Sequence, residues 1–265
     1  MGSFTLSAEQ VNAFGGDGYL IVERLFDSEE MDLLRGIAKG GAEMESLHEP
    51  RDGEGGITRL LISNELHDDI YSAVARSERI VDAMETLLGD EVYHFHHKMA
   101  AKEPRVGGAW AWHQDFGYWY HNSSCLFPDM GSCMVAVDRA TRENGCLQVL
   151  KGSHRCGRIE HGLTGDQSGA DMQRVEALLE RLPRVYVELE AGDGLFFHSN
   201  TLHRSDQNRS DEPRWALICC YNTKHNSPYK MVPNSHPAYK PLDKLPDAMV
   251  RQIGRRQLEQ IHAGR

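Results

Sequence analysis

The chain has 265 residues, of which 40% are hydrophobic and 26% are charged, and its formal net charge at pH 7 is −10. These proportions are ordinary for a globular protein, and the negative charge argues against nucleic acid or an anionic membrane as the main partner. No apolar run approaches the roughly 20 residues that a membrane-spanning helix needs, and the first ten residues lack the basic and apolar regions of a signal peptide. We therefore expect a cytoplasmic protein with no nucleic acid or membrane partner; the oligomeric state stays open.

Two helical patterns dominate the first 90 residues. In residues 27–41, DSEEMDLLRGIAKGG, Asp27 and Glu30 have the spacing of a capping box, and apolar residues follow at helical intervals. Residues 77–89, SERIVDAMETLLG, repeat this pattern and end at a glycine, which is a common stop signal. The run GYLIVERLF, residues 18–26, precedes both helical patterns and predicts an early strand.

From about residue 91 to 225 the pattern changes to short strands separated by Gly, Pro, Asn and Asp, as in an antiparallel sandwich or barrel. The strand-like runs are VYHFHHKMAAK (92–102), SCMVAVD (132–138), GCLQVLKGS (145–153), RVYVELE (184–190), DGLFFHSN (193–200) and RWALICCYN (214–222). The long interruption at 155–183 contains a helical pattern and is a candidate lid or a surface excursion. Residues 226–265 read as a peripheral segment with a polar helix. We predict a single domain over residues 1–265.

The six cysteines form no C-x-x-C pair, which argues against a zinc ribbon or a thioredoxin-type site. We expect all six to be buried, reduced thiols.

The chemistry concentrates around WHQDFGYW, residues 112–119, where His113 and Asp115 stand two positions apart. In a strand, such residues point to the same face. Two histidines and one carboxylate with open positions suit non-haem Fe(II) enzymes that activate oxygen. A second histidine could come from His198 or His203, and Arg214 could hold a carboxylate through two parallel hydrogen bonds. We expect the distal histidine and Arg214 to lie on neighbouring strands of one hairpin.

Four segments together make the pattern specific: DGYLIVERLFDSEE, WHQDFGYW, ENGCLQVLKGSH and LHRSDQNRSDEPRW. In this order, over about residues 17–222, the chain resembles the phytanoyl-CoA dioxygenase family of Fe(II)/2-oxoglutarate-dependent oxygenases. The resemblance implies a mainly β fold with flanking helices, whose core is a double-stranded β-helix (a cupin-like jelly roll) that holds iron between two sheets. It also implies 2-oxoglutarate and O2 as cosubstrates.

The resemblance assigns roles to individual residues. His113, Asp115 and His203 are the expected iron ligands, which leaves His198 as a core histidine. Arg214 resembles the residue that binds the distal carboxylate of 2-oxoglutarate, with Ser205 as its hydroxyl helper. Related halogenases lack the carboxylate found here at Asp115, so we expect hydroxylation with release of succinate and CO2. The ENGCLQVLKGSH segment is expected to be a turn and a strand, with Gly145 and Gly152 at special backbone angles.

The substrate is less constrained. Alternation along residues 92–102 groups His94, His96, Lys98, Ala100 and Lys102 on one face, and His96 and Lys98 could contact substrate or cosubstrate there. The same face could instead be a solvated sheet edge. Trp119 resembles an aromatic substrate contact of the ectoine-hydroxylase relatives. A small polar or anionic metabolite would suit an inward Lys98.

Three alternatives stay open. The enzyme could act on an acyl-CoA or lipid-like substrate, as the family name suggests. A cupin-type metal enzyme could use the HFHH stretch at 94–97. A jelly-roll protein could also bind a metal or ligand without catalysis.

Overall fold

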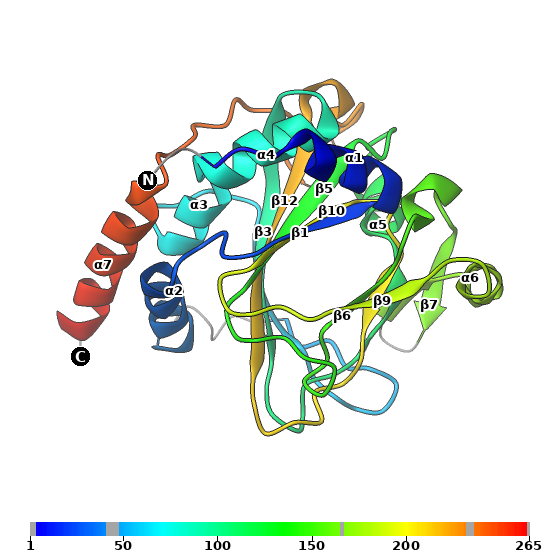
Figure 1. The fold of residues 1–265 in the computed structure, drawn as a ribbon, viewed down its shortest axis with the longest axis horizontal. Coiled ribbons are helices and arrows are strands. Elements are labelled where there is room, and N and C mark those ends of the chain that lie inside the picture. The colour runs from blue at the N-terminus through cyan, green and yellow to red at the C-terminus, as the bar shows by residue number, and fades with distance from the viewer. Residues whose placement is uncertain (1–3, 41–47, 165–166, 232–235, 264–265) are drawn as a thin grey trace.

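The structure, a computed structural model, describes residues 4–40, 48–164, 167–231 and 236–263. A six-stranded antiparallel sheet forms its largest layer (Figure 1). In spatial order its strands are β1 (Tyr19–Val22), β10 (Gly194–His198), β5 (Met130–Ala136), β12 (Arg214–Thr223), β3 (Val92–Lys102) and β2 (Arg59–Ser63). Within the described ranges, no helix is long and apolar enough to cross a membrane.

A second, four-stranded sheet faces the first and completes a jelly roll (Figure 1). Its strands are, in order, β4 (Trp110–His113), β11 (His203–Ser205), β6 (Leu147–Leu150) and β9 (Arg184–Val187). A separate hairpin of β7 (His161–Thr164) and β8 (Gln167–Ala170) flanks β4. Apolar side chains of both sheets pack against one another between the layers, among them Met134, Leu195, Val149 and Val187. The predicted jelly-roll class is therefore confirmed.

Helices cover the outer face of the six-stranded sheet. They are α1 (Ala8–Asp17), α2 (Ser28–Gly40), α3 (Ile70–Ala75), α4 (Glu78–Leu88) and the C-terminal α7 (Ala248–Ala263). The largest apolar cluster of the described residues joins these helices to the sheet, with Leu34, Ile80 and Met84 packed among the residues that include Val135 and Leu217. Two further helices, α5 (Asp115–Asn122) and α6 (Met172–Leu179), flank the smaller sheet.

The predicted helix ends agree with the structure in their main features. Asp27 and Glu30 form the reciprocal capping box at the start of α2, with N···O distances of 3.0 and 3.1 Å. Gly89 ends α4 in the left-handed region at φ 73°. The predicted C-terminal helix lies at the edge of the molecule in Figure 1, where its Gln257 accepts a hydrogen bond from the backbone N–H of Ile70 on α3.

The strand β3 departs from the predicted alternation. Cys220 of β12 is opposite His96 while Tyr221 is opposite His94, so Phe95 is an extra residue and forms a β-bulge. The bulge removes His94 from the face of His96; its Nε2 lies 2.9 Å from Nδ1 of His97 instead. The alternative prediction, that this face is a solvated sheet edge, is also wrong. The strand β3 lies between β12 and β2 and is almost entirely buried.

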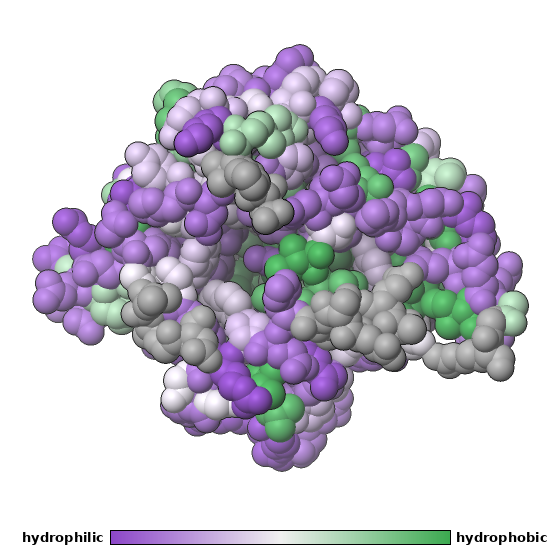
Figure 2. All heavy atoms as spheres, turned by 180° about the vertical axis from the view of Figure 1, so that it is seen from behind, coloured by the Kyte–Doolittle hydropathy of each residue, from purple (hydrophilic) through white to green (hydrophobic). Residues whose placement is uncertain are grey.

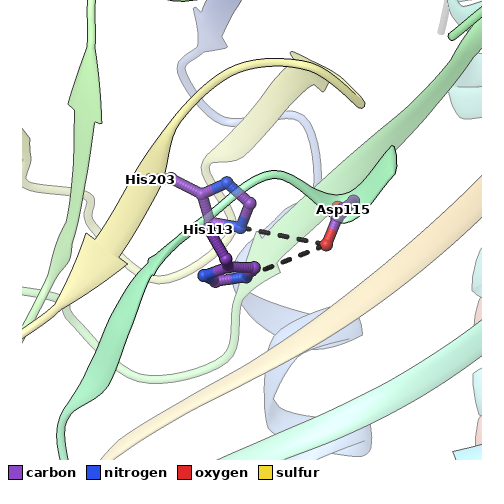
Figure 3. A group of neighbouring side chains, drawn as sticks. All are labelled: His113, Asp115 and His203. Atoms are coloured by element: carbon purple, nitrogen blue, oxygen red, sulfur yellow. Dashed lines mark ion pairs between the residues drawn. The ribbon is translucent and has the colours of Figure 1, made fainter. Parts of the chain in front are cut away.

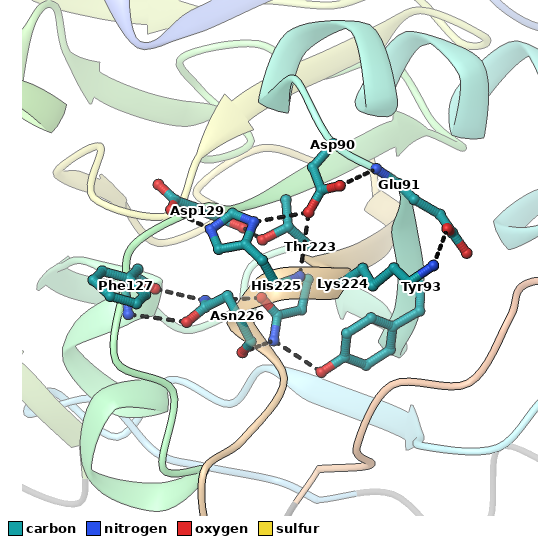
Figure 4. A network of polar contacts seen from close by, with 10 residues as sticks. Asp90, Glu91, Tyr93, Phe127, Asp129, Thr223, Lys224, His225 and Asn226 are labelled. Carbon is teal, nitrogen blue, oxygen red and sulfur yellow. Dashed lines mark hydrogen bonds and ion pairs between the residues drawn. The ribbon is translucent and has the colours of Figure 1, made fainter.

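A polar network anchors the end of β12 (Figure 4). His225, in the 3-10 turn Lys224–Asn226, lies between two carboxylates, with 2.7 Å to Asp90 Oδ2 and 2.9 Å to Asp129 Oδ2. Asn226 exchanges two hydrogen bonds with the backbone of Phe127. These contacts tie together the segments that precede β3 and β5, at the end of the sheet where α5 finishes.

All six cysteines are free thiols, as expected, and five of them are buried. Cys156 is exposed, at the end of the 3-10 turn Ser153–Cys156, so the prediction of burial is wrong for this residue.

Candidate active site

His113 and His203 lie opposite each other on two paired strands of the smaller sheet. His113 ends β4, His203 begins β11, and their ring centroids are 4.0 Å apart. Asp115 does not share a strand face with His113, contrary to the prediction. Gln114 is instead the N-cap of α5, and Asp115 is the first residue of that helix. The strand-to-helix turn therefore brings the carboxylate toward the two imidazoles.

The three side chains converge on one point inside the jelly roll (Figure 3). Their ligand atoms all lie within 4.8 Å of one another, and Asp115 Oδ1 is 3.9 Å from Nε2 of each histidine. All three residues are buried. Two nitrogens and one carboxylate oxygen on one side of a point are the donor set that suits Fe(II) and leave further coordination positions open. His198 lies outside this group; its Nδ1 accepts a hydrogen bond from the backbone N–H of Asn200.

The surroundings favour metal binding by the Nε2 atoms. His113 Nδ1 is 2.8 Å from the carbonyl oxygen of Ala111, and His203 Nδ1 is 2.9 Å from that of Thr201. Donation of the Nδ1 protons to these carbonyls leaves the Nε2 lone pairs for a metal. Burial lowers the pKa of both imidazoles, which favours the neutral, metal-binding form. Ser132 Oγ donates to Asp115 Oδ2 at 3.2 Å and orients the carboxylate.

The turn between the ligands is held by a residue to which the sequence gives no role. The buried Gln114 side chain donates to the carbonyl oxygens of Gly157 and Asn200 and accepts from the N–H of Ile159, at 2.7–2.9 Å. Its backbone N–H donates to His161 Nε2 at 3.0 Å. Part of the segment predicted as a lid or excursion thus supports the ligand turn, and only the three-dimensional fold reveals this.

A small cavity of about 70 Å³ adjoins the two histidines between the sheets. Figure 2 shows a hollow near the middle of the face opposite to the view of Figure 1, with hydrophobic side chains beside it. Arg214 lines the cavity with 4% of its surface exposed. The only hydrogen bond of its guanidinium to a described residue is a 3.6 Å contact from Nη2 to Met134 Sδ, and its Nε has no partner there. A buried guanidinium without an anion is unfavourable, so Arg214 fits a free carboxylate.

Ser205 and Lys102 stand beside Arg214. Lys102 Nζ donates to Ser205 Oγ at 2.7 Å and to the carbonyl oxygen of Asp206 at 2.6 Å. Burial, together with the nearby Arg214 cation, lowers the pKa of the Lys102 ammonium well below its usual value. Lys102 is directly opposite Arg214 in the pairing of β3 with β12.

The prediction that His203 and Arg214 lie on one hairpin is wrong, because β11 belongs to the smaller sheet and β12 to the larger one.

The residues that were predicted to contact the substrate lie in two different places. Lys98 lines the cavity, and its ammonium group makes no hydrogen bond or ion pair with a described residue. His96 and Trp119 do not line the cavity; they lie together, with ring centroids 5.7 Å apart, in the region where Trp119 packs on Phe95. His94 and His97 bond to each other on the other side of the strand, so the HFHH stretch does not gather around one metal.

A histidine pair and a carboxylate inside a jelly roll, next to a buried unpaired guanidinium, define an Fe(II)/2-oxoglutarate-dependent oxygenase. The family model of phytanoyl-CoA dioxygenase (PhyH) matches residues 14–216, and the chain belongs to this family. The predicted family, the dioxygenase class and the iron and 2-oxoglutarate cofactors are thereby confirmed.

Relatives of known activity match over most of their length. The chain is 28% identical to L-proline trans-4-hydroxylase of Streptomyces griseoviridis, with 86% of this chain and 89% of the relative covered. It is also 28% identical to ectoine dioxygenase of Bordetella bronchiseptica, with 91% and 87% covered.

Solved structures show the same fold. EctD from S. alaskensis with 2-oxoglutarate and 5-hydroxyectoine has a TM-score of 0.76 at 23% identity, covering 93% of this chain and 90% of that one. The non-heme alpha-ketoglutarate-dependent carbocyclase SnoK from nogalamycin biosynthesis has a TM-score of 0.69 at 21% identity, with 92% and 96% covered.

Proposed function

We propose that this dioxygenase hydroxylates a compact metabolite that carries a carboxylate or a similar anionic group. The observation that supports this most directly is Lys98, a partly buried cation that lines the cavity and whose ammonium has no partner among the described residues. Burying an unpaired charge is unfavourable, and a bound anion relieves that cost. The relatives named for L-proline and ectoine act on small polar molecules, which agrees with this proposal. The family description favours an acyl-CoA substrate, but no feature of the cavity does.

In this proposal His113, Asp115 and His203 hold iron, and Arg214 and Ser205 bind the distal carboxylate of 2-oxoglutarate. Lys102 supports that end by donating a hydrogen bond to Ser205 Oγ. When bound, iron with 2-oxoglutarate and O2 supplies the oxidising chemistry that converts a substrate C–H to C–OH and 2-oxoglutarate to succinate and CO2. The chain itself orients the ligands through Ala111, Thr201 and Ser132 and excludes water by burial. We also propose a cytoplasmic enzyme that needs no nucleic acid or membrane, as the net charge of −10 suggests.

The test is an anaerobic titration of the apoprotein with Fe(II) and 2-oxoglutarate, followed by succinate release in air. We expect a weak visible charge-transfer band in the wild type. In Asp115→Ala we expect weakened iron binding and no hydroxylation, because one of three protein ligands is gone. The control is Asp243→Ala, whose carboxylate is largely exposed and 3.9 Å from Arg76. Near-normal succinate release from Asp115→Ala with a full iron complement would overturn the proposed ligand set.

A further inference from the structure

One carboxylate ties together three loops at one end of the jelly roll. Asp52 lies in the turn before β2, and its Oδ1 accepts hydrogen bonds from the backbone N–H groups of Glu54 and Gly56, at 2.9 and 2.8 Å. Its Oδ2 accepts from the N–H of Ala109 at 2.6 Å and from Nε2 of Gln207 at 2.9 Å. The carboxylate therefore joins its own turn to the β3–β4 connection and to the β11–β12 connection.

Each of these loops continues into the wall of the cavity. The first leads to Thr58, the second ends at Trp110, and the third begins after Ser205. All three residues line the cavity. Ser205 is also the residue that is proposed to bind the distal carboxylate of 2-oxoglutarate together with Arg214. A shift of any of the three loops therefore changes the cavity at its cosubstrate end.

The loops pack closely on one another and on the strand that carries Lys102. A Cβ added to Gly108 would lie 2.5 Å from the carbonyl oxygen of Gly56, so these two backbones are in direct contact. The backbone N–H of Asn208 donates to the carbonyl oxygen of Gly107 at 2.8 Å, and its side chain donates to that of Lys102 at 3.2 Å. Since Lys102 also donates to the proposed carboxylate-binding serine, the loops and the cosubstrate end form one connected structure.

Asp52 is ionised at this junction. Partial burial raises the pKa of its carboxyl group, but the hydrogen bonds that it accepts outweigh this effect and hold the pKa below its usual value. Hydrogen bonds to a charged acceptor are stronger than those between neutral groups. A neutral side chain of the same shape would therefore hold the loops less firmly.

We propose that Asp52 is a positioning residue for 2-oxoglutarate, and that its carboxylate keeps the cosubstrate end of the cavity shaped for a diacid of this length. This inference rests on the proposed function, in which Ser205 and Arg214 bind the distal carboxylate. Asp52 is not among the described residues that line the cavity, so it acts through the loops that it joins. When these loops loosen, Ser205 is displaced and the cavity excludes a longer diacid less strictly.

The experiment uses the full chain loaded with Fe(II) and titrates the charge-transfer band with 2-oxoglutarate under anaerobic conditions. Asp52→Asn keeps one carbonyl oxygen for its own turn, but its amide group then faces the N–H groups of Ala109 and Gln207. We expect the affinity for 2-oxoglutarate to fall about tenfold or more. Iron affinity and the maximal rate of succinate release at saturating 2-oxoglutarate should change much less.

The matched control is Asp211→Asn. Asp211 also joins the β11–β12 connection to the β3–β4 connection, through Arg105, but this ion pair is largely exposed and neither residue lines the cavity. A second variant, Gln207→Ala, removes one donor to Asp52 and leaves the Asp52 turn intact. Because both changes break the same contact, adding Gln207→Ala to Asp52→Asn should lower the affinity much less than Gln207→Ala does alone.

A second measurement separates positioning from a general loss of stability. 2-Oxoadipate has one methylene group more than 2-oxoglutarate, so a cavity wall that is held in place discriminates against it. We expect the ratio of the affinities for 2-oxoglutarate and 2-oxoadipate to fall in Asp52→Asn and to be unchanged in Asp211→Asn. A loss of stability alone would lower the fraction of folded enzyme and leave this ratio as it is in the wild type.

The contrary outcomes are distinct. Equal 2-oxoglutarate affinities in Asp52→Asn and Asp211→Asn would refute the inference, and so would an unchanged ratio of the two affinities. If Asp52→Asn does not fold, Gln207→Ala decides by the same two measurements. Absence of the charge-transfer band in the wild type is a different result: it would overturn the proposed iron and 2-oxoglutarate site, and this inference with it.

Discussion

Each metal-facing nitrogen of the triad is selected by a hydrogen bond on the other side of its ring. The carbonyl oxygens of Ala111 and Thr201 each lie two residues before the histidine that they orient. Such partners fix both the tautomer and the ring orientation, so the Nε2 atoms of both histidines lie near the Asp115 carboxylate. Arg214 has no such partner, since no carboxylate of a described residue pairs with its guanidinium.

This difference makes Arg214→Lys an informative change. Lysine keeps the positive charge but loses the planar pair of N–H donors, so one charge-assisted hydrogen bond to a carboxylate is lost. Such a bond contributes about 1.5–3 kcal/mol, so we expect 2-oxoglutarate affinity to fall about 10- to 100-fold while iron binding is retained. Titration of the charge-transfer band with 2-oxoglutarate measures the affinity directly. Arg139→Lys, at an exposed arginine paired with Glu190, serves as the control. Unchanged 2-oxoglutarate affinity in Arg214→Lys would remove this residue from the site.

At the scale of elements, the position of α5 depends on a close approach to the β7–β8 hairpin. A Cβ added to Gly117, in the first turn of α5, would lie 2.0 Å from Cε1 of the His161 ring. His161 in turn accepts the Gln114 N–H at the start of the helix. The glycine is therefore needed for contact between the helix that carries Asp115 and the hairpin that supports it.

Gly117→Ala should consequently both destabilise the fold and weaken iron binding. Overpacking of this kind costs about 1–3 kcal/mol, and any shift of α5 also moves Asp115. Gly16→Ala is the matched control: this helical glycine has no neighbouring atom within 4 Å of the added Cβ, and alanine there should be neutral or stabilise by about 0.5–1 kcal/mol. Chemical denaturation and Fe(II) titration provide the two measurements.

A double variant separates the clash from other effects of the alanine. In the His161→Ala background the ring is absent, so adding Gly117→Ala should cost much less than it does in the wild type. Equal costs in the two backgrounds would show that His161 is not what excludes a side chain at position 117.

The element predictions also show where sequence patterns stop being informative. Runs of apolar residues were sufficient to predict β3, β5, β6, β9, β10 and β12, because each strand is buried on at least one face. The bulge at Phe95 was not predictable, since it depends on the pairing of β3 with β12 and not on composition. The same limit applies to the connection from His203 to Arg214: spacing alone does not tell a hairpin from a crossing between two sheets.

For the site, the H-x-D pair and the family resemblance were sufficient to select His113, Asp115 and His203, which the fold brings together. The supporting roles of Gln114 and His161, and of Lys102 beside Ser205, come from segments distant in sequence. No local pattern marks such residues, because their roles arise only when the sheets close.

At the scale of the whole molecule, burial of histidine sets the response to acid. Desolvation lowers the pKa of His94 to about 3 and those of His97, His198 and His236 to about 4, from an ordinary value of 6.5. At a pH between these lowered pKa values and 6.5, the unfolded chain binds more protons than the folded one. The free energy of unfolding therefore falls as pH decreases from about 6.5 to 4, by about 1.4 kcal/mol per pH unit for each such histidine.

The acid response can be tested at one buried histidine and one exposed histidine. His198→Asn keeps an acceptor for the Asn200 N–H but does not titrate, so unfolding of the chelated apoprotein should depend less steeply on pH between 6.5 and 4, by roughly one histidine's contribution. His225 should behave in the opposite way, because its hydrogen bonds to Asp90 and Asp129 raise its pKa above 6.5 (Figure 4). Its stabilising contribution is present at low pH and is lost as pH rises through the raised pKa. His225→Gln should therefore destabilise the protein at pH 5.5 and have less effect at pH 8.5. Equal effects of His225→Gln at both pH values, with an unchanged slope for His198→Asn, would show that these histidines do not govern the acid response.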